Sequence, residues 1–169
     1  MTLGMSVATF TLFHTIISVV GIFSGIAVIL AFLRGNIASR WTSLFLGSTV
    51  ATSVTGFMFP VHKFLPSHGV GTLSLIVLAL TIPALYAFHL RGPWRRVYVI
   101  GATVALYFNV FVLVVQAFLK VPVLHALAPT GSEPAFLVAQ TIVLALFVYI
   151  GIVSLKRSRK APILSMAAD

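Results

Sequence analysis

Three side chains suited to binding a metal or haem lie near the ends of two apolar stretches. His14 is early in the first stretch, and Met58 and His62 are four residues apart near the end of the second. Residues four apart share a helix face, and an antiparallel helix pair would bring His14 to a similar depth. Two imidazoles with a thioether suit copper, while two imidazoles on facing helices could hold a b-type haem. Alternatively, the histidines bond to backbone or water and Met58 is packing.

A second set of polar side chains could form a pocket for a quinone head, a lipid head or a small solute. The fourth apolar run contains three polar residues at spacings of seven and four: Asn109, Gln116 and Lys120. On a helix they form one polar stripe on an otherwise apolar surface. Gln140 is expected at the depth of Gln116, and the two amides could simply pair between helices. The pattern predicts an outward-facing ligand-binding pocket lined by Asn109, Gln116, Lys120, His125, Glu133 and Gln140.

Residue types and spacing identify no catalytic group. The chain has no cysteine, which excludes disulfides and thiolate metal sites, and its only acids are Glu133 and Asp169. Paired carboxylates, a nucleophile with its base and a phosphate-binding glycine loop are all missing. We expect Glu133 to be an ion-pair partner of nearby cations. We therefore predict no catalytic residue and a protein that is not an enzyme by itself.

The elements that must position these side chains are five long apolar runs. Hydrophobic residues make up 60% of the 169 residues and charged residues 8%, far from the roughly 25% charged residues of soluble domains. Each run reaches the ~20 residues that a helix needs to cross a bilayer. The sequence predicts an all-α, polytopic bundle in a single domain over 1–160, followed by a cytoplasmic tail over 161–169. The expected transmembrane helices are 5–33, 41–61, 69–90, 97–119 and 135–155.

Positive charge is concentrated in alternate loops. Lys63 and Lys120 lie on one side of the expected bundle, while the other nine of the eleven Lys and Arg residues lie on the opposite side. The positive-inside rule then predicts an N-out, C-in orientation with a retained first helix. Anionic lipid headgroups at the cytoplasmic face are the expected partners, and nucleic acid is not, because no basic stripe is interleaved with aromatics. The nine residues are Arg34, Arg40, Arg91, Arg95, Arg96, Lys156, Arg157, Arg159 and Lys160.

Small residues predict which helices pack closely. Gly21 and Gly25 have the spacing that allows two helix backbones to approach in lipid. The second run has a matching surface of small and hydroxyl-bearing residues, including Ser48, Thr52 and Thr55. We expect the first two helices to form a tight antiparallel hairpin.

One stretch resembles a known group of proteins. The segment LYFNVFVLVVQAFLKVPVLHALAPTGSEPAF, residues 106–136, resembles uncharacterised small multi-span inner-membrane proteins of proteobacteria. The first half, with His14, the glycine-rich face and Arg34-Gly35, is similar to His-bearing bundles that invite comparison with b-type cytochromes, although Arg40-Trp41 stands where a histidine is frequent. The resemblance implies a multi-pass protein of the bacterial inner (cytoplasmic) membrane and transfers no catalytic residue.

Three functional hypotheses follow. The first is a non-catalytic membrane protein that binds a ligand, a lipid, a partner subunit or a second copy of itself through the outward polar cluster. The second is b-type haem or copper binding at His14, Met58 and His62 in redox or metal handling. The third is a small-solute channel or transporter that passes Asn109. The outward cluster consists of His14, Met58, His62, Asn109, Gln116, His125 and Gln140.

Overall fold

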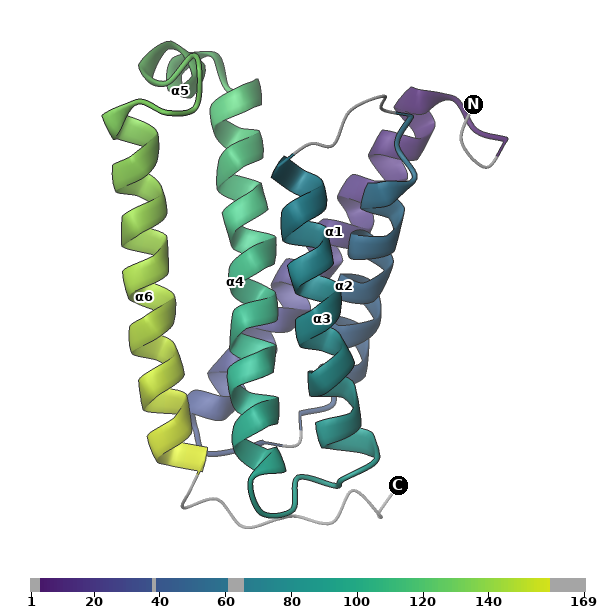
Figure 1. Cartoon of the computed structure of the whole chain (residues 1–169), viewed down its shortest axis with the longest axis vertical. Coiled ribbons are helices and arrows are strands. Elements are labelled where there is room, and N and C mark those ends of the chain that lie inside the picture. Colours follow the sequence, from purple (N-terminus) through teal and green to yellow (C-terminus); the bar gives the residue numbers. More distant parts are fainter. Residues whose placement is uncertain (1–3, 38, 61–65, 159–169) are drawn as a thin grey trace.

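The chain forms a bundle of long helices that run up and down beside one another (Figure 1). The structure, a computed structural model, describes residues 4–37, 39–60 and 66–158. The helices are α1 (Val7–Leu33), α2 (Thr42–Phe57), α3 (Pro66–Tyr86), α4 (Trp94–Lys120), α5 (Pro122–Leu127) and α6 (Pro134–Ser158). The all-α architecture predicted from the apolar runs is confirmed.

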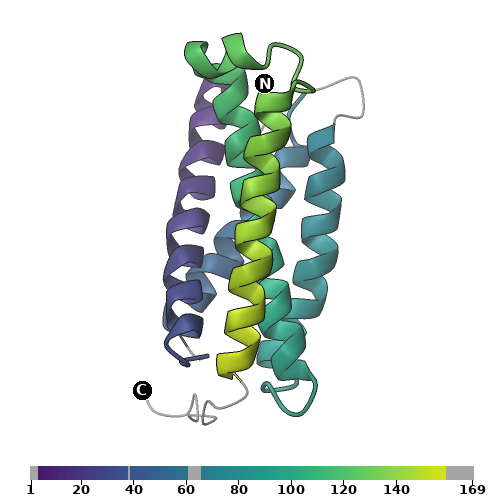
Figure 2. The same cartoon turned by 90° about the vertical axis from the view of Figure 1, so that its left-hand side faces the viewer.

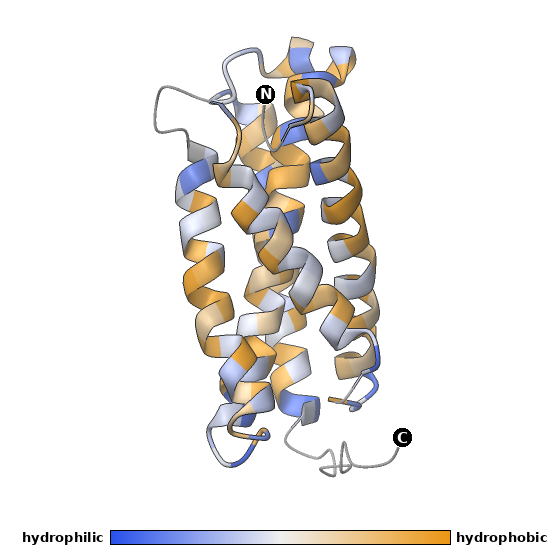
Figure 3. Ribbon diagram, turned by 90° about the vertical axis from the view of Figure 1, so that its right-hand side faces the viewer, coloured by the Kyte–Doolittle hydropathy of each residue, from blue (hydrophilic) through white to orange (hydrophobic). Residues whose placement is uncertain are grey.

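Four of these helices, α1, α3, α4 and α6, are long and apolar enough to cross a membrane. Their ribbons are mostly hydrophobic, and the hydrophilic positions gather toward the ends and loops (Figure 3). The helix α2 has 16 residues and spans about 24 Å at ~1.5 Å per residue, which is less than the ~30 Å of a hydrocarbon core. Helix length and composition therefore identify a membrane protein with four candidate spans among the described residues, where the sequence predicted five.

The predicted helix bounds hold within a few residues, with local reasons for the differences. Ser6 caps α1, because its side chain accepts the backbone N–H of Thr9 at 3.1 Å. The helix α3 ends at Tyr86 instead of residue 90, since His89 and Leu90 have positive φ angles that no helix continues. After α4, Pro122 starts the short helix α5, because proline suits the first helical position.

The helix α4 lies at the centre of the bundle and contacts α1, α2, α3, α5 and α6. The helix α6 packs on α4 and α1 and presents most of its surface outward (Figure 2). The apolar core contains residues of α1 to α4, among them Phe32, Phe45, Leu106 and Tyr98, all at most 2% exposed. This arrangement makes α4 the element that connects the α1–α2 hairpin to the rest of the bundle.

Close packing of α1 on α2, predicted from the glycine spacing, is confirmed. A Cβ atom added at Gly21 would lie 3.2 Å from Ser48 Oγ on α2. One added at Gly25 would lie 2.8 Å from Phe45 Cε2 on α2 and 2.6 Å from Leu106 Cδ1 on α4. Glycine is therefore needed at Gly25 because two other helices occupy the space of a side chain.

The two ends of the bundle differ in charge. At the first end, called the basic end, α1, α3 and α6 finish and α2 and α4 begin, and the described residues there include Arg34, Arg40, Arg91, Arg95, Arg96, Lys156 and Arg157. At the opposite end, the described Lys and Arg residues comprise Lys120 alone. Two arginines of the basic end bind helix C-termini: Arg157 donates to the Leu33 carbonyl of α1, and Arg95 donates to the Ser158 carbonyl of α6 at 3.0 Å.

Candidate functional site

A line of polar side chains, called the polar seam, lies between α1 and α2. It consists of His14 and Ser18 on α1 and Ser48, Thr49, Thr52 and Thr55 on α2. His14 Nδ1 lies 2.8 Å from Thr55 Oγ1, and Ser18 Oγ lies 3.4 Å from Thr52 Oγ1. The density of hydroxyl residues in α2 was visible in the sequence, but the pairing of these partners was not.

Contacts with α2 and Phe59 orient the His14 ring. The Thr55 hydroxyl donates its single proton to the Ala51 carbonyl at 2.7 Å. Since the Thr52 carbonyl is a second backbone acceptor for this hydroxyl at 3.2 Å, the arrangement fits the tautomer in which Nδ1 of His14 donates to Thr55. The edge of the half-buried ring also contacts Phe59, with ring centroids 5.2 Å apart. Nε2 is therefore the nitrogen left to accept a proton or bind a ligand.

The polar seam continues onto α4 through Asn109. This side chain is 9% exposed, and its Nδ2 donates to Thr49 Oγ1 at 3.0 Å. Gly21 stands beside the pair, since a Cβ added there would lie 3.5 Å from Asn109 Nδ2. Asn109 thus joins α4 to α2 at a buried position, where an unpaired amide would be costly.

The predicted metal set is only partly described. His14 is held by Thr55, and Met58 is half-buried and caps the end of α2, where its N–H bonds to the Thr55 carbonyl at 3.1 Å. His62 lies outside the described residues. Within the described part of the chain, no cluster of three or more His, Cys, Asp or Glu side chains could hold a metal ion.

The six residues of the predicted pocket have separate environments. Asn109 faces α2, while Gln140 Nε2 donates to the backbone carbonyl of Phe111 on α4 at 3.2 Å instead of pairing with Gln116. Gln116, Lys120 and His125 are exposed. Across the described residues, no hydrogen bond joins two of the six to one another.

Gln140 has one buried atom that lacks a partner. The side chain is 9% exposed, and Oε1 accepts no hydrogen bond from any described residue. The other such atom in the described residues is Ser154 Oγ, also on α6. A buried acceptor without a donor typically costs ~1–3 kcal/mol, and such atoms in native proteins usually meet water, a ligand or another chain.

Glu133 stabilises its own loop. Its carboxylate accepts the backbone N–H of Thr130 at 3.0 Å, the hydroxyl of Thr130 at 2.8 Å and the backbone N–H of Ser132 at 3.0 Å. These bonds hold the pKa of Glu133 below its ordinary value, and the bond from the Thr130 backbone N–H has the largest effect. Sequence reasoning expected an ion pair for this acid; among the described residues it instead orders the turn before α6.

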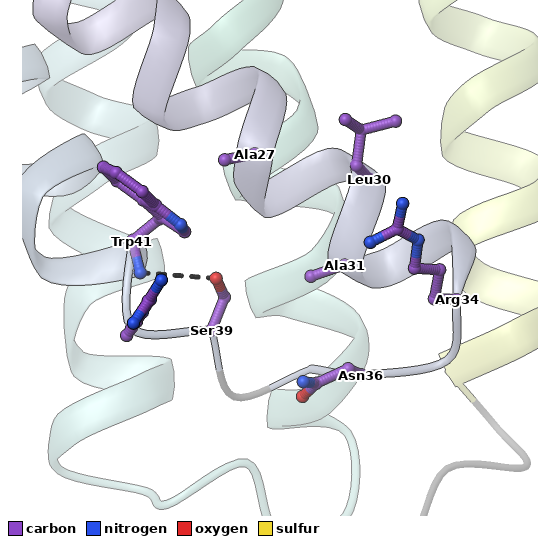
Figure 4. Close-up of a pocket in the computed structure, with 8 residues that line it drawn as sticks. Ala27, Leu30, Ala31, Arg34, Asn36, Ser39 and Trp41 are labelled. Carbon is purple, nitrogen blue, oxygen red and sulfur yellow. Dashed lines mark hydrogen bonds between the residues drawn. The ribbon is translucent and has the colours of Figure 1, made fainter.

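Sequence reasoning missed a pocket at the basic end. The last two turns of α1 and the connection to α2 line an open hollow of about 500 Å³ (Figure 4). The signal was present in the sequence, as two alanines four residues apart on α1 followed by two arginines and a tryptophan. The lining residues are Ala27, Leu30, Ala31, Arg34, Asn36, Ser39, Arg40 and Trp41.

The all-α fold and four helices long and apolar enough to cross a membrane are those of a helical membrane protein. No protein-family model, curated protein or solved structure matches the chain. The resemblance of residues 106–136 to inner-membrane proteins of proteobacteria therefore stays a prediction, and the function must be argued from the side chains.

Proposed function

We propose that the chain is a five-span protein of the bacterial cytoplasmic membrane, N-out and C-in, that binds a ligand or partner and is not catalytic by itself. The orientation is supported by the charge difference between the two ends of the bundle, because cytoplasmic loops carry the excess of Lys and Arg. The basic end is then cytoplasmic, and α5 with the Glu133 loop is outside.

The direction of its neighbours supports the proposed crossing of α2. The helices α1 and α3 both run toward the basic end, so the chain must return between them, and α2 packs along both. A helix of about 24 Å can cross if the bilayer thins or the flanking residues lie within the interface, each at a modest cost. Paired hydroxyls on α2 also keep its polar groups away from lipid.

The chain contains no cysteine, so single introduced cysteines can report this topology without background. Asn36→Cys precedes α2, Ser67→Cys follows it, and Ser132→Cys lies in the Glu133 loop. We expect a membrane-impermeant thiol reagent to label positions 67 and 132 in intact spheroplasts, and position 36 only after permeabilisation. Labelling of positions 36 and 67 from the same side would show that α2 does not cross.

The observation that supports binding is the unpartnered Gln140 Oε1 in the outer half of the bundle. The exposed Gln116, Lys120 and His125 lie on α4 and α5, in the same half. Because Oε1 is buried, a hydroxyl or amide donor from a ligand, a lipid or another chain would satisfy this acceptor only after the side chains that cover it at the α4–α6 contact move aside. Because Gln140 lies on α6, we assign the binding surface to this helix.

Mild extraction followed by native mass spectrometry tests binding. We expect the wild type to carry a stoichiometric extra mass, which Gln140→Leu loses. Thr141→Val is the matched control, because the Thr141 hydroxyl is exposed and donates only to its own helix, at the Leu137 carbonyl; this variant should keep the mass. A wild type that is monomeric and free of ligand, or equal retention in both variants, would refute the role of Gln140.

Haem or copper binding and solute transport were the alternatives from sequence. The bond of His14 Nδ1 to Thr55 leaves Nε2 available to a metal or haem, but the second predicted imidazole, His62, lies outside the described residues. Asn109, the residue expected to line a transport path, is buried against Thr49. Neither alternative gains support from the described side chains. A Soret band or stoichiometric copper in the freshly extracted protein would favour the haem or copper proposal over the one made here.

A further inference from the structure

The pocket at the basic end combines an apolar wall with a cationic rim. Ala27, Leu30, Ala31 and Arg34 lie at spacings of three and four, so they share one face of α1. In Figure 4 the two alanines lie between Trp41 on one side and Leu30 and Arg34 on the other. Because alanine side chains are short, the space beside them stays open, and its volume of about 500 Å³ is typical of small-molecule sites.

Local contacts hold the side of the pocket formed by Ser39, Arg40 and Trp41. The N–H of Trp41 donates to Ser39 Oγ at 3.3 Å, which holds the turn that begins α2. The guanidinium carbon of Arg40 lies 5.8 Å from the centroid of the Trp41 ring, a cation–π distance. Trp41 is 43% exposed, as expected for a tryptophan at a membrane interface.

Nothing among the described residues neutralises the two arginines of the pocket. Arg34 and Arg40 are exposed, and neither guanidinium donates a hydrogen bond within the described part of the chain. Of the two acids, Glu133 lies at the opposite end of the bundle and Asp169 lies outside the described residues. By contrast, Arg95 and Arg157 already bind helix carbonyls. The described part of the chain therefore supplies no counter-charge to Arg34 and Arg40, and an anion from another molecule could supply it.

The position of the pocket selects the type of anion. Its cationic rim is at the end of α1, while Leu30 and Ala27 are one to two turns further into the apolar segment. A soluble anion would contact only the cationic rim. A glycerophospholipid would contact the rim with its phosphate and the apolar wall with an acyl chain. Guanidinium groups match phosphate oxygens in bidentate geometry and attract anionic headgroups.

We infer that this pocket binds one anionic glycerophospholipid, with its phosphate at Arg34 and Arg40 and an acyl chain along the Ala27–Ala31 face of α1. The inference rests on the membrane location of the chain, but it does not depend on the orientation or on the binding surface at Gln140. It gives the basic end a defined lipid site in addition to general attraction to the bilayer surface.

Native mass spectrometry of the full chain in neutral detergent tests the site. Phosphatidylglycerol and phosphatidylcholine with identical acyl chains are added separately, and glycerol 3-phosphate serves as the soluble anion. We expect one phosphatidylglycerol to be retained at least about tenfold better than phosphatidylcholine, and glycerol 3-phosphate not to displace it. Equal retention of both lipids, or displacement by glycerol 3-phosphate at similar concentration, would overturn the inference.

Matched variants separate the pocket from net charge. Arg34→Gln with Arg40→Gln removes two charges inside the pocket, and Arg91→Gln with Arg96→Gln removes two exposed charges of the same end outside it. We expect about tenfold weaker phosphatidylglycerol retention in the first pair and less than about twofold in the second. Ala31→Leu fills the apolar side while keeping both arginines and should also weaken retention. Equal losses in the two arginine pairs, or unchanged retention in Ala31→Leu, would refute a built site.

Discussion

A methyl group at Gly25 should destabilise the bundle more than one at any other glycine of the α1–α2 hairpin. The added Cβ would lie 2.6 Å from Leu106 Cδ1 and 2.8 Å from Phe45 Cε2, where carbon atoms normally sit ~3.5–4.0 Å apart. Phe45 and Leu106 are 1% and 2% exposed and belong to the apolar core, where neighbouring side chains resist a change of position. Accommodating Gly25→Ala therefore requires these two side chains, or the helices that carry them, to shift.

The size of the effect follows from the packing around each glycine. Overpacking a full core typically costs ~1–3 kcal/mol, and we expect Gly25→Ala in the upper half of that range because it presses on two helices. At Gly21 the nearest atom is Ser48 Oγ at 3.2 Å, a smaller clash, so Gly21→Ala should cost below ~1 kcal/mol. The larger Gly21→Leu should separate α1 from α2.

The free energy of unfolding in mixed micelles, titrated with SDS and followed by circular dichroism, measures these differences. Gly47→Ala on α2 is the control, since no heavy atom lies within 4 Å of its added Cβ, and it should be neutral within ~0.5 kcal/mol. The reasoning fails if Gly25→Ala is as stable as Gly47→Ala, or if an intact bundle tolerates Gly21→Leu.

Three further predictions concern other contacts. His14→Ala should lower the free energy of unfolding by only ~1 kcal/mol, because it removes one interhelical hydrogen bond. Adding Thr55→Val to this variant should cause little further loss, because it removes the same bond. Additive losses in the double variant would contradict this pairing. Gly101→Ala should weaken α3–α4 packing, because the added Cβ overlaps the Thr81 hydroxyl, and Thr81→Ala should partly restore stability; absence of rescue would place the strain elsewhere. The stability of the Glu133 loop should depend on pH, because the pKa of Glu133 is lowered in the folded state. The stabilisation by the Glu133 carboxylate is complete above the ordinary pKa of 4.5 and is lost as pH falls through the lowered folded-state pKa. The protection factors of the Thr130 and Ser132 amides against hydrogen exchange should fall over that acid range in the wild type and show no such step in Glu133→Gln.

Local sequence features predicted several elements correctly because they depend on neighbouring residues. The apolar runs gave α1, α3, α4 and α6 as long helices, and the spacing of Gly21 and Gly25 gave the face on which α1 meets α2. The end of α3 was predicted four residues too late, because hydropathy does not report the positive φ angles of His89 and Leu90.

Partners between distant helices could not be predicted in the same way. Gln140 was expected to meet Gln116, yet it bonds to the Phe111 carbonyl, since the rotation of α6 about its own axis depends on all of its contacts with α4 and α1. The bond of Asn109 to Thr49 was likewise not foreseen, because it depends on how the central helix α4 packs on α2; the assignment of Asn109 to a ligand pocket stays a prediction. The metal set remains partly open, as His62 lies outside the described residues.

By itself, the sequence determined that this is a helical membrane protein with its positive charge gathered at one end, because hydropathy, segment length and charge are properties of contiguous residues. Tertiary structure alone decided that His14 bonds to Thr55, that Gln140 keeps a free acceptor and that Arg34, Arg40 and Trp41 surround a pocket. Each of these depends on the register and rotation of packed helices, and those are settled by side-chain interlocking among residues far apart in the chain.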